Sequence, residues 1–169
     1  LNGAIPDVVI CCIGVLGEQK KSQVSNEYAS YLIRSNYEGP VNILSLFANV
    51  FEDRGSGTII GISSVAGIRG RASNYFYGSA KSGFISFLSG LRNRLYKKGV
   101  RVITVLPGYV ETKMISNLDL NKFLIVQPDK AAQQIYNAYI KNKDIIYVWS
   151  IWKIIMLIIR IIPEKIFKK

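Results

Sequence analysis

Residues 58–64 read Thr58-Ile59-Ile60-Gly61-Ile62-Ser63-Ser64, an apolar run that ends in two hydroxyl side chains. A continuous apolar run rich in β-branched residues favours a parallel strand covered on both faces, because a half-exposed strand alternates apolar and polar residues. Ligands of parallel α/β proteins bind at the carboxyl ends of the strands. Ser63 and Ser64 are therefore candidate site residues, although serines at a strand end are also ordinary turn formers.

Three further runs are also nearly continuous in apolar residues, so the sequence contains four predicted strands. Segments with the apolar spacing of helices lie between consecutive strands. The runs are residues 8–13, 100–106 and 144–149. The predicted helices are residues 27–51, with a break or kink at Gly39-Pro40, residues 77–97 and residues 128–141. The order β-α-β-α-β-α-β predicts an α/β fold with a parallel sheet and helices on both of its faces.

The first apolar run, residues 8–13, begins close to the start of the sequence. Nothing before it can cover its outer edge, and an uncovered apolar edge strand invites aggregation. We therefore expect further strands beside it that this sequence does not contain, so that the amino-terminal half of the fold is missing. Residues 1–148 are then the carboxyl-terminal part of one domain, and residues 149–169 form an apolar and basic helix with a tail.

Composition removes several classes of protein. The 169 residues suffice for one domain, and 49% hydrophobic against 20% charged residues excludes a disordered chain. The sequence has two adjacent cysteines and no histidine, which excludes a disulfide framework, most zinc sites and any nucleophile activated by histidine. No acidic cluster suggests another metal site. The net charge is +11, but the basic residues are dispersed and match no nucleic-acid-binding motif, so we expect no nucleic acid partner.

Tyr77 and Lys81 lie four residues apart in the second predicted helix, and this spacing puts both side chains on one face. A nearby ammonium favours the phenolate and lowers the pKa of a tyrosine from about 10, as a general acid or base requires. The sequence contains two more pairs with this spacing, Tyr109/Lys113 and Tyr139/Lys143, and chance alone predicts roughly one. A surface pair is the alternative. Only Tyr77 opens a long helix that follows a strand ending in hydroxyls.

These features together resemble the short-chain dehydrogenases/reductases, whose signature is a strand-end serine, Tyr-x-x-x-Lys thirteen residues later, and Pro-Gly after the next strand. Here Ser64 precedes Tyr77 by thirteen residues, and Pro107-Gly108 follows the third apolar run. The resemblance implies a Rossmann-like parallel sheet, NADP or NAD as cofactor, and reduction of a small-molecule ketone to a secondary alcohol.

The resemblance also implies roles for individual residues. Ser64 would orient the substrate carbonyl, Tyr77 would exchange the hydroxyl proton, and Lys81 would lower the pKa of Tyr77 and hold the nicotinamide ribose. Asn36 matches the asparagine that completes the proton relay of the family. The residues implied in cofactor binding are Gly14, Tyr77, Lys81, Pro107, Gly108, Val110 and Thr112.

Two departures from the family concern the cofactor. The Asn-Asn-Ala-Gly of the family appears here as Cys11-Cys12-Ile13-Gly14, so that only the glycine carries over. We expect both cysteines to be small buried strand residues. The Gly-rich turn and helix that bind the pyrophosphate in the family do not precede Leu1. Half of the cofactor site is therefore expected to be missing from this sequence.

Residues 13–19, 71–79 and 149–167 further resemble a subgroup that reduces keto sugars linked to polyprenyl phosphates. On a helix, Ser150, Lys153, Leu157, Arg160 and Glu164 form one narrow stripe, and the other faces are apolar. Such a helix, ending in lysines, fits the surface of an anionic membrane or the mouth of a lipid tunnel. No apolar run is long enough to span a membrane, and no signal peptide is present, so we expect a cytoplasmic protein with peripheral membrane contact.

Two alternatives stay open. In the first, the chain is a reductase of a soluble ketone, and its tail helix is a dimer contact. This agrees with the homo-oligomer that we expect. In the second, the chain is a membrane-associated protein that keeps the fold without catalysis.

Overall fold

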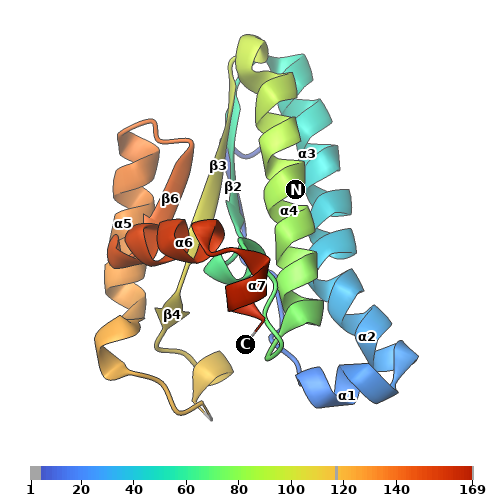
Figure 1. Cartoon of the computed structure of the whole chain (residues 1–169). Helices are drawn as coiled ribbons and strands as arrows, with labels where there is room; N and C mark the ends of the chain where they lie inside the picture. The colour runs from blue at the N-terminus through green and yellow to red at the C-terminus, as the bar shows by residue number, and fades with distance from the viewer. Residues whose placement is uncertain (1–4, 117, 169) are drawn as a thin grey trace.

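Four parallel strands form the central sheet in the order β1-β2-β3-β6 (Figure 1). The computed structural model describes residues 5–116 and 118–168. Each strand falls within one residue of a predicted apolar run, except that β1 ends two residues earlier. The predicted parallel sheet is confirmed. Its strands are β1 Val8–Cys11, β2 Gly57–Ile62, β3 Val100–Pro107 and β6 Ile145–Val148.

Helices cover both faces of the sheet, as predicted. Helices α3 (Gly39–Arg54) and α4 (Tyr75–Leu95) pack on one face, where Phe51 and Phe84 are buried against strand residues. Helix α5 (Pro128–Ile140) packs on the other face through Ala131 and Ala138 (Figure 1). Within the described residues β1 is an edge strand.

Several short elements at the carboxyl edge of the sheet were not predicted. They are α1 Gln19–Val24, the 3₁₀ turns Val65–Gly67, Lys113–Ile115 and Lys122–Leu124, and the two-stranded parallel pair β4 Tyr109–Val110 and β5 Ile125–Val126. Figure 1 shows β4 where β3 ends and α1 at the lower right, beside α2 (Asn26–Ile33). Several residues of these short elements line the cavities described below.

Of the predicted break or kink at Gly39-Pro40, a break is not found. Helix α2 (Asn26–Ile33) continues through a π-helical turn, Arg34–Glu38, into α3. Pro40 stands in the first turn of α3, where its missing N–H is tolerated because the preceding turn is wider. The π turn carries Asn36, whose side chain is fully buried. Such turns are frequent at functional sites because the extra residue redirects a side chain.

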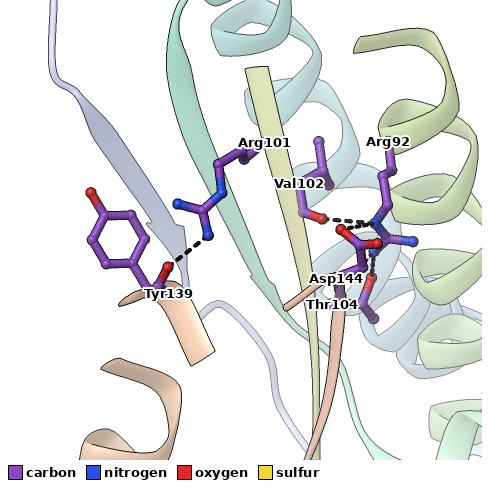
Figure 2. Close-up of polar contacts among 6 residues, drawn as sticks. All are labelled: Arg92, Arg101, Val102, Thr104, Tyr139 and Asp144. Carbon is purple, nitrogen blue, oxygen red and sulfur yellow. Dashed lines mark hydrogen bonds and ion pairs between the residues drawn. The ribbon is translucent and has the colours of Figure 1, made fainter. Parts of the chain in front are cut away.

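Two arginines fasten α4, β6 and α5 to strand β3. The Arg92 guanidinium donates to Val102 O at 2.8 Å, to Thr104 Oγ1 at 2.5 Å and to Asp144 O at 3.0 Å. Arg101 donates to Tyr139 O at 2.7 Å, at the carboxyl end of α5, where a cation is favourable. Figure 2 shows the two guanidinium groups on opposite sides of β3. These contacts lie away from the carboxyl edge, so we assign them to the fold.

The tail begins as one helix but does not continue to residue 164. Helix α6 (Ile151–Ile161) ends before Pro163, and α7 (Glu164–Phe167) is a separate turn, so Glu164 does not share the predicted stripe on α6. No helix within residues 5–116 and 118–168 is long and apolar enough to cross a membrane.

Arg69 holds the tail against the loop that follows β2. Its guanidinium donates to the carbonyls of Ile159 and Ile162, pairs with Glu164 at 2.7 Å and lies 3.9 Å from the ring centre of Phe167. The two carbonyls belong to the last turn of α6 and its end, which have no partner within the helix. Arg69 thereby docks α6 beside the carboxyl edge of the sheet.

Candidate active site

Ser64 stands at the end of β2, where the strand gives way to the 3₁₀ turn Val65–Gly67. Its hydroxyl accepts a hydrogen bond from Ala66 N at 3.1 Å, so it caps this turn. Ser63, its neighbour, donates to Lys81 O at 2.9 Å and ties β2 to α4. Both serines thus combine a structural hydrogen bond with a place on the wall of one cavity.

Lys81 lies one turn after Tyr77 in the amino-terminal half of α4, and both side chains are buried. Tyr77 is 8% exposed and Lys81 is 3% exposed. The Lys81 Nζ donates to Ile13 O and Ile62 O, each at 3.3 Å, at the ends of β1 and β2. Burial lowers the pKa of Lys81 from 10.5 to about 8, because the protein interior disfavours the charged form.

The pKa of Tyr77 differs from the prediction. Burial raises it above the ordinary value of 10, and only interaction with the Ser64 hydroxyl acts in the opposite direction. The Lys81 Nζ is directed to the two strand-end carbonyls and lies 5.8 Å from the centre of the Tyr77 ring, so its charge does not reverse this direction. Desolvation therefore keeps the Tyr77 phenol in its protonated form.

Asn36 and Gly14 lie together behind this pair. The Asn36 amide accepts from Val15 N at 3.1 Å and donates to Val15 O at 2.8 Å and Leu32 O at 2.9 Å. It thus fixes the loop after β1. A methyl group on Gly14 would lie 2.8 Å from Asn36 Oδ1 and 2.9 Å from Lys81 Nζ, so this position accepts only glycine without displacing one of them.

Replacing Gly14 with alanine is expected to lower the free energy of unfolding by about 1–3 kcal/mol, because the added methyl group has no space. It should also displace Lys81 and reduce activity of the full-length protein. Urea unfolding and steady-state kinetics measure the two effects. Gly70→Ala is the matched control, since a methyl group there meets no atom within 4 Å. Equal stability of the two variants would contradict the close approach.

All the residues predicted to bind the cofactor line one cavity of about 660 Å³, which we call cavity 1. Ser64 lines it as well, whereas Asn36 is buried behind the wall and reaches neither this cavity nor the next. Cys12 also lines cavity 1 and is exposed, so the prediction of a buried strand residue holds for Cys11 and is wrong for Cys12. The reason is that β1 ends at Cys11.

A second cavity of about 560 Å³, cavity 2, lies on the other side of Tyr77. Ser64, Tyr77 and Gly108 line both cavities, so the phenol and the serine stand where the two meet. The sequence analysis missed four polar residues of cavity 2. Asn74 and Arg71 could have been suspected, because they precede Tyr77 closely. The other two, Gln19 and Trp152, come from distant parts of the chain, and although each stands in a stretch that resembles the keto-sugar reductases, nothing in the sequence brings them to one cavity.

The other two tyrosine–lysine pairs do not form comparable sites. Lys113 and Lys143 are exposed, whereas Lys81 is buried. The ring of Tyr109 packs on Trp152, and that of Tyr139 lies under Arg101. Of the three pairs, Tyr77/Lys81 is thus the one in which the lysine is buried.

Comparisons with known proteins identify the family of the chain. Residues 5–122 match the family model of short chain dehydrogenases. The chain is 31% identical over 170 residues to an uncharacterized oxidoreductase of Mycobacterium tuberculosis, covering 99% of this chain and 67% of that protein. It is 32% identical over 139 residues to the acetoacetyl-CoA reductase of Allochromatium vinosum, covering 76% of this chain and 56% of the reductase.

Solved structures share the fold. A short chain dehydrogenase from Burkholderia cenocepacia, solved in complex with NADP, superimposes with a TM-score of 0.79 at 23% identity. The match covers 91% of this chain and 66% of that one. A bulky-bulky ketone specific alcohol dehydrogenase from Comamonas testosteroni matches with a TM-score of 0.74 at 19% identity, covering 94% of this chain and 64% of that one. The chain therefore spans about two thirds, or less, of the length of these relatives.

Proposed function

This chain belongs to the short-chain dehydrogenase family, and from that premise we propose that it is part of an NAD(P)-dependent oxidoreductase that reduces a ketone to a secondary alcohol. The observation that carries the proposal is the position of Ser64 and Tyr77 at the meeting of two cavities, with Lys81 buried one helical turn from Tyr77. One cavity can then take the cofactor and the other the substrate.

Cavity 1 fits the nicotinamide end of NADP or NAD. Gly14 lies on the wall of this cavity with Asn36 and Lys81 packed directly against it, and the Lys81 ammonium offers a donor for a ribose hydroxyl. Pro107, Gly108, Val110 and Thr112 form the facing wall. When bound, the nicotinamide supplies the hydride.

The residues of the chain position the ketone and supply a proton. Ser64 would donate a hydrogen bond to the carbonyl oxygen, and Tyr77 would give its proton to the same oxygen as that atom becomes negative. The raised pKa of Tyr77 suits this direction, because the phenol is protonated at neutral pH. The Lys81 charge would stabilise the phenolate left behind, and Asn36 would act as a positioning residue through the Val15 loop.

The test is a spectrophotometric assay of NADPH and NADH oxidation by the full-length protein, with a panel of ketones and identification of the product alcohol. We expect turnover that requires both a nicotinamide cofactor and a ketone, and the assay also decides between NADP and NAD. Absence of both cofactor binding and turnover would contradict the proposed function and favour a non-catalytic protein that keeps the fold.

For the substrate, we propose a keto sugar linked to a polyprenyl phosphate, as handled by decaprenylphosphoryl 2-keto-ribose 2-reductase, which the sequence resembles. The tail supports a lipid substrate, because one side of α6 packs on the sheet through Trp152 and Met156 while its outer side is apolar and exposed. The exposed apolar residues of α6 and α7 are Ile154, Leu157, Ile158, Ile161 and Ile166. Lys153, Arg160, Lys165 and Lys168 lie beside them and are also exposed. A cytoplasmic protein in peripheral contact with an anionic membrane would use such a surface.

Vesicle flotation tests this membrane contact. The full-length protein should float with vesicles that contain phosphatidylglycerol, and the double variant Leu157→Gln/Ile161→Gln should stay in solution. Ile43→Gln/Leu46→Gln is the control, because these exposed residues lie on α3. Light scattering on the same samples measures the predicted homo-oligomer. The opposite outcome is a wild-type protein that does not float and a tail variant that no longer forms the oligomer. That outcome would favour a tail helix that serves as a dimer contact, in a reductase of a soluble ketone.

A further inference from the structure

The wall of cavity 2 includes polar side chains with atoms that form no hydrogen bond with the rest of the described chain. Among the side chains of residues 5–116 and 118–168, five buried nitrogen or oxygen atoms lack a hydrogen-bond partner. Four of them belong to residues that line cavity 2, and the fifth, Nη2 of Arg54, belongs to a residue that does not. Such atoms are rare in native proteins, so four around one cavity indicate a ligand that pairs with them. The four are Gln19 Nε2, Arg71 Nε, Asn74 Oδ1 and Trp152 Nε1.

Trp152 is the most constrained of the four. It is 3% exposed, and its indole meets the ring of Tyr109 edge-on, with centroids 5.2 Å apart and planes at 82°. A methyl group on Gly108 would lie 1.9 Å from the Trp152 Nε1, so the indole nitrogen is pressed against the turn that borders the reacting groups. The contact requires α6 in its docked position. The tail helix therefore contributes directly to the wall of cavity 2.

Gln19 and Asn74 are also held in place by hydrogen bonds. The Gln19 Oε1 accepts from Phe76 N at 3.3 Å, which leaves the Nε2 group of the same amide for a ligand. Asn74 directly precedes α4, and its backbone carbonyl accepts from Gly78 N at 2.8 Å. It stands three residues before Tyr77, at the same end of the helix. The polar wall is thus built on the elements that carry the catalytic pair.

The donors and the acceptor define the chemistry of the ligand. Gln19, Arg71 and Trp152 offer N–H groups, and Asn74 offers a carbonyl oxygen. A hydroxyl group both accepts and donates, so several hydroxyls on one small molecule satisfy all four, whereas a hydrocarbon next to the carbonyl satisfies none. Resting on the proposed function, we propose that these four residues determine specificity and select a ketone flanked by hydroxyl groups.

The experiment compares two ketones of the same ring size in the full-length protein, cyclohexanone and its pentahydroxy derivative. Trp152→Phe removes the N–H and keeps an aromatic ring, and Asn74→Leu removes the acceptor. We expect each variant to lower the ratio of kcat/KM for the hydroxylated ketone to kcat/KM for cyclohexanone about tenfold, because a buried hydrogen bond of this kind governs discrimination between the two ketones. Trp149→Phe is the matched control, since Trp149 lines neither cavity.

Binding of myo-inositol, measured by calorimetry, gives a readout without turnover. Trp152→Phe should weaken this binding about tenfold and Trp149→Phe should not. A wild-type protein that binds the polyol but reduces no ketone would disprove the proposed function, and it would still support the inference that these residues bind hydroxyl groups. A Trp152→Phe variant that changes both ketones equally, or a wild type that does not bind the polyol, would overturn the inference while ketone reduction itself could stand.

Discussion

Tyr77→Phe in the full-length protein is expected to lower ketone turnover by about 10³-fold, because a positioned general acid contributes roughly 10²–10⁴-fold. The phenyl ring keeps the packing of the buried side chain, whereas the proton donor at the meeting of cavities 1 and 2 is lost. Cofactor affinity should change little, since cavity 1 keeps its other walls. Stopped-flow measurement of hydride transfer and fluorescence titration of the cofactor separate the two effects.

The control for this variant is Tyr109→Phe, which removes a hydroxyl from a tyrosine that also lines cavity 2. It should retain most of the turnover, because Tyr109 packs against Trp152 rather than beside Ser64. Full turnover by Tyr77→Phe would remove Tyr77 from the mechanism. A parallel loss of cofactor affinity would instead show that the hydroxyl serves binding.

Lys81→Met is expected to separate activity from stability. Turnover should fall by about 10²-fold, because the charge that stabilises the phenolate is removed. The free energy of unfolding at pH 7 should nevertheless not fall. Burial lowers the pKa of Lys81 from 10.5 to about 8, and a shift of this size corresponds to about 3 kcal/mol of cost for the buried charge at pH 7. Loss of the two hydrogen bonds to Ile13 O and Ile62 O offsets part of the gain.

The pH dependence of stability gives a sharper test of Lys81. Between pH 8 and 10.5 the unfolded lysine still binds a proton that the folded lysine has released, so the wild-type free energy of unfolding should rise across this window. The cost of the buried charge is fully present below pH 8. Lys81→Met should lack the rise, and Lys97→Met, at an exposed position after α4, should keep it. Urea unfolding at several pH values measures this; a flat wild-type profile would show that Lys81 is not buried as a charge.

Local sequence accounts for the sheet and for the placement of Tyr77 and Lys81. The apolar runs at residues 8–13, 58–62, 100–106 and 144–149 form the four strands in the predicted parallel arrangement. Tyr77 and Lys81 face one side of α4 because positions four apart share a helix face. The carboxyl ends of neighbouring strands meet at one edge, which is why Ser64 and Pro107-Gly108 reach the same cavity. The period of the apolar residues and the parallel direction of the strands are enough to predict these three features.

Other features depend on contacts between residues far apart in the chain, and periodicity carries no information about them. The π turn at Asn36 exists because that side chain is held by the loop after β1. The direction of the Tyr77 pKa shift follows from desolvation by surrounding elements, which outweighs the local Lys81 charge. The polar wall of cavity 2 forms only when α1 and α6, which begin at residues 19 and 151, dock beside α4. Local hydrophobic pattern thus specified the strands, and helix spacing put Tyr77 and Lys81 on one face, while burial and long-range packing decided the direction of the Tyr77 pKa shift and the shape of the pocket.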